Sequence, residues 1–403
     1  MLATLLLSAL PLGQTWTVDD DGPADFASIG AAIPQVAAGD VLLVSPGTYP
    51  PFVLQKELTI LGLPNLPRPL ITGESTVFGV AELTLAGLSF AKLEVFSVAG
   101  RCRIDDCDVG LTGFVPFSEA ALFISNCPQL ELSRVDAMGR MSTCNTDHAA
   151  ARISSSTAAV VDSFFTAGDP ASFCQFSALH GAPAVRVEGG SLVTFAGSSL
   201  VGGACGSNPS MVTFQAEGGD ALVVTDSTVI LRGSATDGLV PHLFGGCPGG
   251  PGFAVEAAGS VIVSSGLTVG FLAYDLTESV LLEPVPPQPY LAITGTDGPG
   301  GERRILVYGP AGEPYVLVTS LVDAFAAFPG VEGLVWLDAG SPVHVVTLAA
   351  VGQDTAQAFL VPLPATAGLE GVALTAQALF PGLSGAQDPT AALVTNPASI
   401  VLR

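Results

Sequence analysis

A loose repeat between about residues 120 and 269 constrains this chain more than any other feature of its sequence. Each copy has a small residue, a short alternating apolar run, a Ser, Asp or Gly turn, a second apolar run and a Gly-rich loop. The copies begin with alanines that return at intervals of about 29 to 37 residues: Ala121, Ala150, Ala184, Ala221 and Ala254. Repeats of this length are typical of solenoids. Because one copy is too small to bury its own apolar face, neighbouring copies must stack, which predicts a right-handed parallel β-helix.

The composition agrees with an all-β chain of more than one domain. Hydrophobic residues make up 49% of the 403 residues and charged residues 12%, so a large core is easily filled. We expect the β-helix over residues 14–282 and a Pro-rich linker over 283–289. Short strands separated by turn signals then predict a small antiparallel β-sandwich over 290–403.

The first 13 residues form a short apolar run that ends in small residues and Pro. The run is too short to span a bilayer and is typical of the apolar part of a signal peptide, although no basic residues precede it. The alternative is a buried first strand. No later segment has the length and hydropathy of a transmembrane helix, so we expect a secreted protein, either extracellular or held at the cell surface.

Seven cysteines in an exported chain indicate disulfides with one thiol left over. Four of them lie in the Gly-rich loops that follow repeat copies, and stacking would bring these loops together. The first pairings to test are Cys144 with Cys174 and Cys205 with Cys247. The pairing of Cys102, Cys107 and Cys127 cannot be deduced. No spacing of Cys and His indicates a zinc site.

Two segments resemble known families. The first consists of Asp21-Gly22, Phe26, Ile29, Ala32-Ile33, Gly39-Asp40-Val41, Val44, Pro46-Gly47-Thr48-Tyr49 and Leu58-Thr59-Ile60-Leu61-Gly62. It resembles the N-terminal cap of pectinesterase-like and pectin-lyase-like β-helix proteins, which implies a short helix that plugs the open end of the barrel. The later motifs of pectin methylesterases and the basic residues of pectate lyases are not visible.

The second resemblance lies in the C-terminal part of the chain. It is carried by Phe359-Leu360-Val361-Pro362-Leu363-Pro364, Leu369-Glu370-Gly371, Gln377-Ala378 and Thr395-Asn396-Pro397. These residues are similar to a C-terminal module of secreted proteins from Planctomycetes-like bacteria. The resemblance implies export of an accessory domain and assigns no activity to it.

The densest polar cluster is the candidate catalytic site. Aligning residues 103–108 with 131–136 and 160–165 places Cys107, Val135 and Phe164 in one inward column. The columns beside it then hold Asp106 with Arg134, and Asp108 with Asp136, about 4.8 Å apart. Such stacked carboxylates suit a retaining glycosidase, and their proximity would raise one pKa as a general acid requires.

Other interpretations of these acidic residues remain open. The stacked carboxylates could share a Ca²⁺ ion with Asp105, and the Asp19-Asp20-Asp21 run could also hold Ca²⁺, although it lacks the spaced ligands of an EF-hand. No other cofactor or metal is indicated. Alternatively, the cluster contains only turn and outer-face residues paired with Arg101, Arg103 and Arg134.

Loop residues after the cluster are candidate binding residues. Arg140, Asp147, His148 and His180 leave the same edge of the predicted helix, together with Asp169, and could form the wall of a groove. The alternative for each histidine is an ordinary surface side chain.

The net charge of −23 argues against several classes of binding partner but does not identify a particular one. It repels nucleic acids and anionic membranes, and it opposes an anionic polysaccharide unless a local Arg cluster offsets it. Two functions remain. The first is a monomeric secreted scaffold that contacts extracellular polysaccharide or another envelope component without catalysis. The second is a polysaccharide lyase or glycoside hydrolase that uses the carboxylate cluster.

Overall fold

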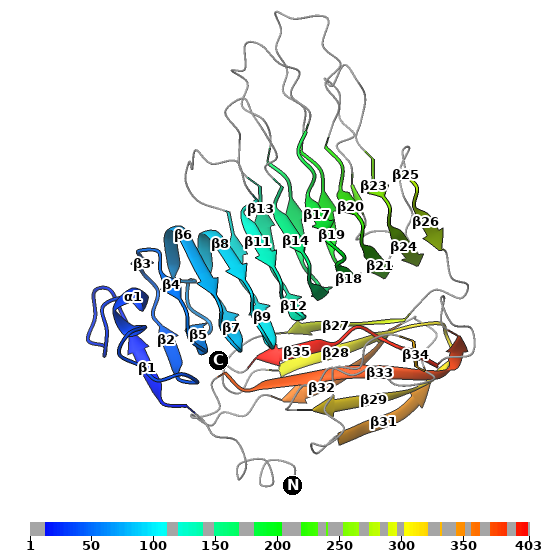
Figure 1. Cartoon of the computed structure of the whole chain (residues 1–403). Helices are drawn as coiled ribbons and strands as arrows, with labels where there is room; N and C mark the ends of the chain where they lie inside the picture. The colour runs from blue at the N-terminus through cyan, green and yellow to red at the C-terminus, as the bar shows by residue number, and fades with distance from the viewer. Residues whose placement is uncertain are drawn as a thin grey trace, which may run out of the picture.

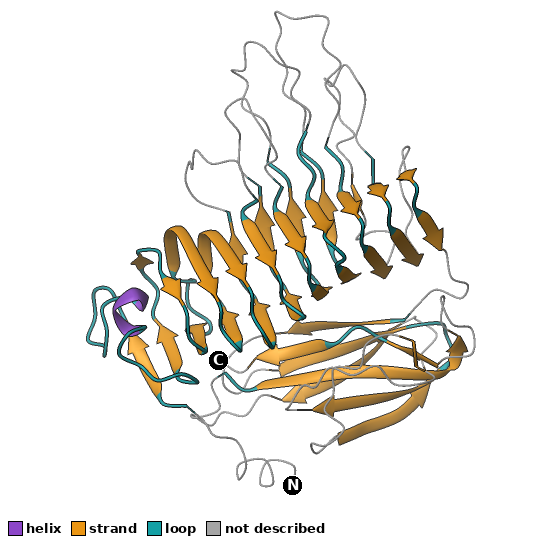
Figure 2. Cartoon of the chain, in the orientation of Figure 1, coloured by secondary structure: helices purple, strands orange, loops and turns teal. Residues whose placement is uncertain are grey.

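A computed structural model describes most of the chain. The described residues are 13–110, 120–139, 149–168, 181–203, 219–232, 239–240, 253–265, 274–282, 289–295, 302–320, 331–332, 344–350, 356–362, 371–384 and 392–401. Nearly all regular structure in them is β-strand (Figure 2). No helix among these residues is long and apolar enough to cross a membrane.

The N-terminal part is a stack of rungs built from two parallel sheets (Figure 1). The first sheet has 11 strands in chain order. They are β1 (Thr15–Val18), β2 (Val41–Val44), β5 (Leu58–Gly62), β7 (Leu83–Ala86), β9 (Arg101–Asp105), β12 (Gln129–Ser133), β15 (Thr157–Val161), β18 (Leu192–Ala196), β21 (Thr228–Arg232), β24 (Val261–Ser265) and β26 (Val280–Leu282). Each strand pairs in parallel with its neighbour one rung away, as a parallel β-helix requires.

The second sheet has 15 strands and divides into two ladders. It starts with β3 (Thr48–Tyr49), β4 (Val53–Leu54), β6 (Leu70–Phe78) and β8 (Ser89–Phe96). The first ladder continues through β10 (Asp108–Val109), β13 (Asp136–Met138), β16 (Phe164–Thr166), β19 (Ser199–Val201) and β22 (Leu239–Val240). The second ladder continues through β11 (Leu122–Ser125), β14 (Ala151–Ser154), β17 (Val185–Glu188), β20 (Leu222–Thr225), β23 (Val255–Ala258) and β25 (Tyr274–Thr277). The start of β8 pairs with β10 and its end with β11, so the ladders diverge there.

The repeat seen in the sequence is the rung of this helix. Registers between neighbouring strands place the five lead alanines opposite one another on successive rungs. All five are buried, with at most 5% of the side chain exposed. The interior of the helix is a single continuous apolar cluster that includes Leu85, Ile104 and Leu132. The predicted right-handed parallel β-helix is therefore confirmed as the fold of this part.

The rungs turn at residues in the left-handed backbone conformation. One corner uses Gly87, Asp106, Arg134, Asp162 and Gly197, and the other uses Gly79, Ser97, Asn126, Ser155, Gly189, Asp226, Gly259 and Glu278. Gly, Asn and Asp tolerate this conformation best, which explains the Ser, Asp and Gly turns of the repeat.

A short helix covers the N-terminal end of the stack. Helix α1 (Ile29–Ala32) begins after Ser28, whose hydroxyl accepts a hydrogen bond from the N–H of Ala31. Ile29 and Ala32 are fully buried against the first rung. Asp40 ends the segment by accepting bonds from the N–H groups of Ala37 and Gln14 and from the indole of Trp16.

The C-terminal strands form two small, mainly antiparallel sheets. One contains β27 (Tyr290–Gly295), β28 (Glu302–Tyr308) and β32 (Ala356–Pro362). The other contains β29 (Pro314–Ser320), β30 (Val331–Glu332), β31 (His344–Ala350), β33 (Ala373–Ser384), β34 (Ala392–Val394) and β35 (Ala398–Val401). Their own apolar cluster, which includes Leu291, Leu317 and Phe380, lies between the sheets. This is the predicted small β-sandwich.

The sandwich lies along the outer face of the 11-stranded sheet (Figure 1). Two apolar contacts join the bodies: Ala196 with Tyr290 and Ala292, and Leu61 with Ala373 and Val401. Outward side chains such as Arg103, Glu131 and Ala159 are consequently buried, whereas Thr194 and Ile230 remain partly exposed. The sequence did not reveal this docking.

Several sequence predictions lie outside the described residues. They include residues 1–12 of the proposed signal peptide, linker residues 283–288 and the four cysteines proposed for disulfides, Cys144, Cys174, Cys205 and Cys247. Cys102, Cys107 and Cys127 are described, and all three are free thiols inside the β-helix, so the expectation that a single thiol is left over is wrong.

Candidate functional site

The structure brings the predicted carboxylates together on the first ladder. Asp108 and Asp136 are direct partners in the register of β10 with β13, and Arg134 stands opposite Asp106 at the preceding corner. Cys107 and Val135 share an inward column with at most 1% of each side chain exposed. The first half of the sequence alignment is therefore correct.

The second half of the alignment is wrong by one residue. Phe164 pairs with Asp136, and Phe165 pairs with Ala137. Because neighbouring residues of a strand face opposite sides, the slip turns Phe164 outward, where 44% of it is exposed. Phe165 is fully buried instead, and Ser163 takes the inward place beside Val135. Asp108, Asp136 and Phe164 thus form one outward column.

Arg68, which the sequence analysis missed, forms ion pairs with two carboxylates at this column. Its guanidinium contacts Asp108 through Nη1 and lies 2.6 Å from Asp106 through Nη2. Arg68 belongs to the segment before β6, some 40 residues from Asp108 in sequence. No local motif connects the two, although a Pro-Arg-Pro stretch before a strand is a place where an Arg can be held rigidly.

Asp136 is the carboxyl of the column that keeps an open environment. Among the described residues, no hydrogen bond or ion pair involves its side chain. Partial burial raises the pKa of Asp136, the charge of Asp108 raises it further, and Arg68 opposes both effects. Exposed Phe164 stands beside it on the next rung, and Met138, 40% exposed, follows it on the same face.

Two residues assigned to the cluster have mainly structural roles. Asp106 and Arg134 occupy corner positions with φ values of 51° and 53°. Arg134 also lies 2.6 Å from Asp105, which is completely buried. Asp105 lies on the 11-stranded sheet, whereas Asp108 and Asp136 lie on the other sheet, so a Ca²⁺ ion shared by all three receives no support from this geometry.

The aspartates near the N-terminus form a compact group. Asp19, Asp20 and Asp21 place carboxylate oxygens within 4.8 Å of one another. Asp19 accepts bonds from the N–H groups of Asp21 and Gly22, and Asp20 accepts one from Thr48. These carboxylates therefore cap turns. The predicted loop residues Arg140, Asp147, His148, Asp169 and His180 lie outside the described residues.

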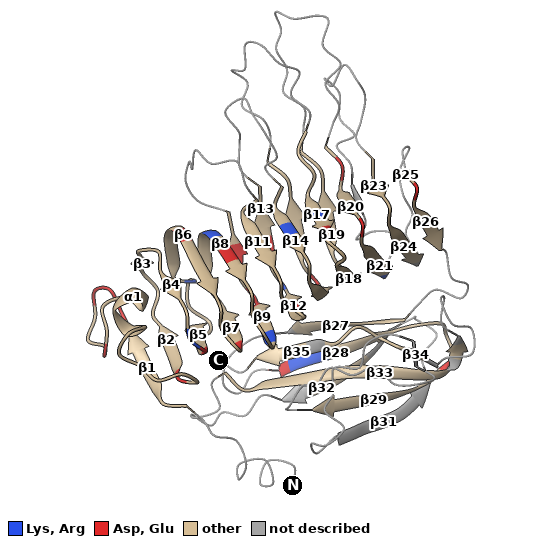
Figure 3. Cartoon of the chain, viewed as in Figure 1, with Lys and Arg blue, Asp and Glu red and all other residues tan. Residues whose placement is uncertain are grey.

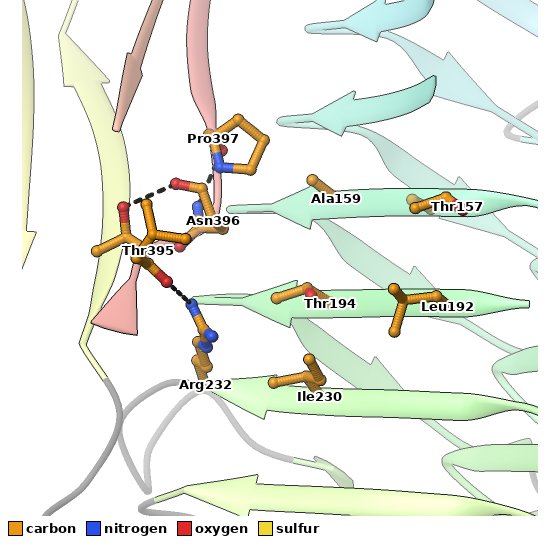
Figure 4. Close-up of a pocket in the computed structure, with 11 residues that line it drawn as sticks. Thr157, Ala159, Leu192, Thr194, Ile230, Arg232, Thr395, Asn396 and Pro397 are labelled. Carbon is orange, nitrogen blue, oxygen red and sulfur yellow. Dashed lines mark hydrogen bonds between the residues drawn. The ribbon is translucent and has the colours of Figure 1, made fainter. Parts of the chain in front are cut away.

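A cavity of about 50 Å³ lies elsewhere in the described part of the chain, in the seam between the helix and the sandwich (Figure 4). Arg232, Thr194 and Thr157 line it on one side, and Thr395 and Asn396 line the other. The Arg232 guanidinium donates to the carbonyl of Val394 at 3.1 Å, and the Asn396 amide is bonded to the backbone of Leu291. The Arg232 bond joins the two bodies, whereas the Asn396 bonds lie within the sandwich, and no predicted site residue lines the cavity.

A surface of aromatic side chains on the second ladder was also missed by the sequence analysis. Phe78 and Phe96 are register partners on β6 and β8, and Phe123 follows on β11. Charged side chains lie beside them on the same strands (Figure 3), with Lys92 bonded to Glu74 and Glu94, and Glu94 is the register partner of Phe123. The register and the partial exposure of the three rings place them on the outer face.

No family model matches the sequence, and no curated protein sequence matches it. Among solved structures, the chain is similar to the enzymatically active domain of tailspike protein 2 from bacteriophage CBA120, at 9% identity and a TM-score of 0.33, over 95% of this chain and 74% of that one. Full-length tailspike protein 2 of an Escherichia coli O157:H7 bacteriophage matches at 10% identity and a TM-score of 0.27, over 90% of this chain and 64% of its own length. At these scores the likeness carries no argument about function.

Proposed function

We propose that this chain is a secreted β-helix protein that binds extracellular polysaccharide through the outer face of its first ladder, without cleaving it. The observation that carries the proposal is the outward column of Asp108, Asp136 and exposed Phe164. An exposed ring offers an apolar platform to the C–H face of a sugar, and neighbouring carboxyls offer hydrogen bonds to its hydroxyls. The apolar N-terminal run supports export.

The ion pairs of Arg68 favour binding over hydrolysis. Glycosidases use two carboxyl groups that flank the scissile bond, one as an acid and one as a base or nucleophile. Here Asp108 is held by Arg68, so among the described residues of the column only Asp136 has a carboxyl outside an ion pair. A hydrolase is the second candidate because the raised pKa of Asp136 is a property that a general acid needs.

The test is binding of the purified full chain to dextran, hydroxyethylcellulose, galactomannan and xylan. We expect at least one polymer to bind and Phe164→Ala to weaken that binding more than about fivefold, because truncating an anchoring aromatic residue costs more than about 1 kcal/mol. Leu360→Ala, which removes a side chain 58% exposed on the sandwich, is the matched control and leaves affinity unchanged.

Each other outcome has a defined meaning. Binding to none of the polymers, or equal binding by wild type and Phe164→Ala, contradicts the proposed site. Release of reducing sugar from the same polymers, lost in Asp136→Asn, would replace the binding function with the hydrolase.

A further inference from the structure

We propose that the second ladder carries a separate binding strip for an uncharged polysaccharide chain that lies parallel to the axis of the β-helix. The aromatic strip consists of Phe78, Phe96, Phe123 and Arg152, with Glu188 at its end. The inference depends on the proposed function for the class of ligand, and it concerns a different face of the molecule.

The three rings occupy outward positions on three successive rungs. Phe78 is 39% exposed, and Phe96 and Phe123 are half-buried. The ring centroids of Phe96 and Phe123 are 5.2 Å apart with a tilt of 60°. On the following rungs the register partners of Phe96 are Ser125 and Ser154, so the outward positions of this column do not require aromatic residues.

Arg152 extends the strip to a fourth rung. Its guanidinium lies 5.4 Å from the centroid of Phe123, a cation–π distance. Nε and Nη2 both donate to Oε1 of Glu188, at 2.9 and 2.6 Å, which fixes the plane of the guanidinium. The Arg152 side chain remains 42% exposed, and its bonds to Glu188 do not use Nη1, so this nitrogen can donate to a hydroxyl of a ligand.

The direction of the strip determines the shape of its occupant. Rungs repeat at about 4.8 Å, and the strip follows the helix axis in two adjacent columns, one with Phe78 and Phe96 and the next with Phe123 and Arg152. An extended polymer with a flat apolar face in each unit matches such a strip. A peptide strand does not, because the strands beneath already pair on both sides and offer no free edge for strand addition.

The charge of the strip favours an uncharged chain. Arg152 is neutralised by Glu188, and the whole chain carries a net charge of −23. Lys92, the other cation beside the rings, is likewise engaged by Glu74 and Glu94, so an anionic polymer would gain little local attraction against the overall negative charge.

The experiment uses the full chain and the same four polymers. Carboxymethylcellulose is added because it has the same backbone as hydroxyethylcellulose but carries negative charge. The strip variant is Phe96→Ser with Phe123→Ser, and its thermal unfolding and circular dichroism are compared with wild type. We expect the strip variant to bind the recognised neutral polymer about fivefold or more weakly. Adding Phe164→Ala should abolish the remaining binding, and carboxymethylcellulose should bind more weakly than hydroxyethylcellulose.

A milder substitution guards against a folding defect. Arg152→Gln keeps hydrogen-bonding capacity but loses the cation–π contact, and it should weaken binding less than the strip variant does. If folded strip variants bind as wild type while Phe164→Ala binds weakly, the strip is refuted and the proposed function stands. Tighter binding of carboxymethylcellulose refutes the uncharged class, and binding of no polymer refutes both proposals.

Discussion

At the scale of single residues, the corner positions explain why polar residues gather at the edge of each rung. Asp106, Arg134 and Asp162 are successive corner residues with φ between 47° and 53°. Asp106 and Asp162 have the short polar side chain that tolerates this backbone conformation well, whereas Arg134 does not. The polar density that suggested catalysis therefore comes partly from backbone geometry.

Asp220 is a titrating residue that the sequence analysis did not single out. Its carboxylate accepts a 2.6 Å bond from the N–H of Phe253 on the next rung. Burial and the neighbouring Glu256 carboxyl raise the pKa of Asp220 to about 7, against the lowering effects of the Phe253 N–H and Arg186.

This shift predicts a loss of stability as the pH rises from about 4 to 7. In that window the folded protein keeps a proton on Asp220 that the unfolded chain, with a pKa of 3.8, has released. We expect Asp220→Asn to flatten the dependence of the urea midpoint on pH in this window. Wild type and variant with equal slopes would contradict the assignment.

The control for this prediction lies at lower pH. Hydrogen bonds from Thr17 lower the pKa of Asp25, so stability from that group is lost only as the pH falls below about 4. Asp25→Asn should therefore leave the dependence of the urea midpoint on pH unchanged between pH 4 and 7.

At the scale of elements, a ladder of serines fastens one corner of the β-helix. Its members are Ser156, Ser191, Ser227, Ser260 and Ser279. Each hydroxyl accepts the N–H of the corner residue one rung earlier, at 3.0 to 3.2 Å, and donates to a carbonyl of its own rung. The serine that recurs in the repeat thus replaces a backbone bond that the turn prevents.

We predict that Ser227→Ala lowers the free energy of unfolding by about 1–3 kcal/mol, because it leaves the N–H of Ser191 buried without an acceptor. The measurement is chemical denaturation. Ser154→Ala, at a half-buried outward position, is the control and should change stability by less than about 0.5 kcal/mol. Equal losses of unfolding free energy in Ser227→Ala and Ser154→Ala would mean that the serine ladder does not stabilise the β-helix.

At the scale of the whole molecule, a buried polar centre joins the helix to the sandwich. Arg103 and Glu131 form an ion pair at 3.1 Å with at most 1% of each side chain exposed. Arg103 also donates to Thr375 and Ser399 of the sandwich, and Ser399 donates to Glu131. The outer face of the 11-stranded sheet is therefore built for the sandwich rather than for solvent.

We predict that Glu131→Gln destabilises the chain by about 3–5 kcal/mol, because Arg103 keeps a buried charge without its carboxylate. Replacing both residues, Arg103→Met with Glu131→Met, should cost less than the single change. Glu82→Gln, which breaks the exposed pair with Arg101, is the control at about 0–1 kcal/mol. Urea unfolding measures the stability of all three variants. A double variant that is less stable than Glu131→Gln would refute the explanation that an uncompensated buried charge causes the loss.

The sequence by itself determined the stacked parallel β-helix, its capped N-terminal end and the antiparallel sheets at the C-terminal end. It could do so because the repeat length and the alternation of apolar residues are local properties of the chain. It also aligned Asp108 with Asp136, since their rungs have similar turns. It slipped by one residue at Phe164 because Phe164 and Phe165 are both apolar, and alternation alone does not choose between them.

The tertiary structure alone decided which faces meet and which side chains stay open. Arg68 reaches Asp108 across 40 residues, and Arg103 reaches Ser399 across 296. Such contacts depend on how rungs and sheets pack, which no window of the sequence records. The same packing leaves Phe78 and Phe164 in solvent while it buries charged side chains under the sandwich.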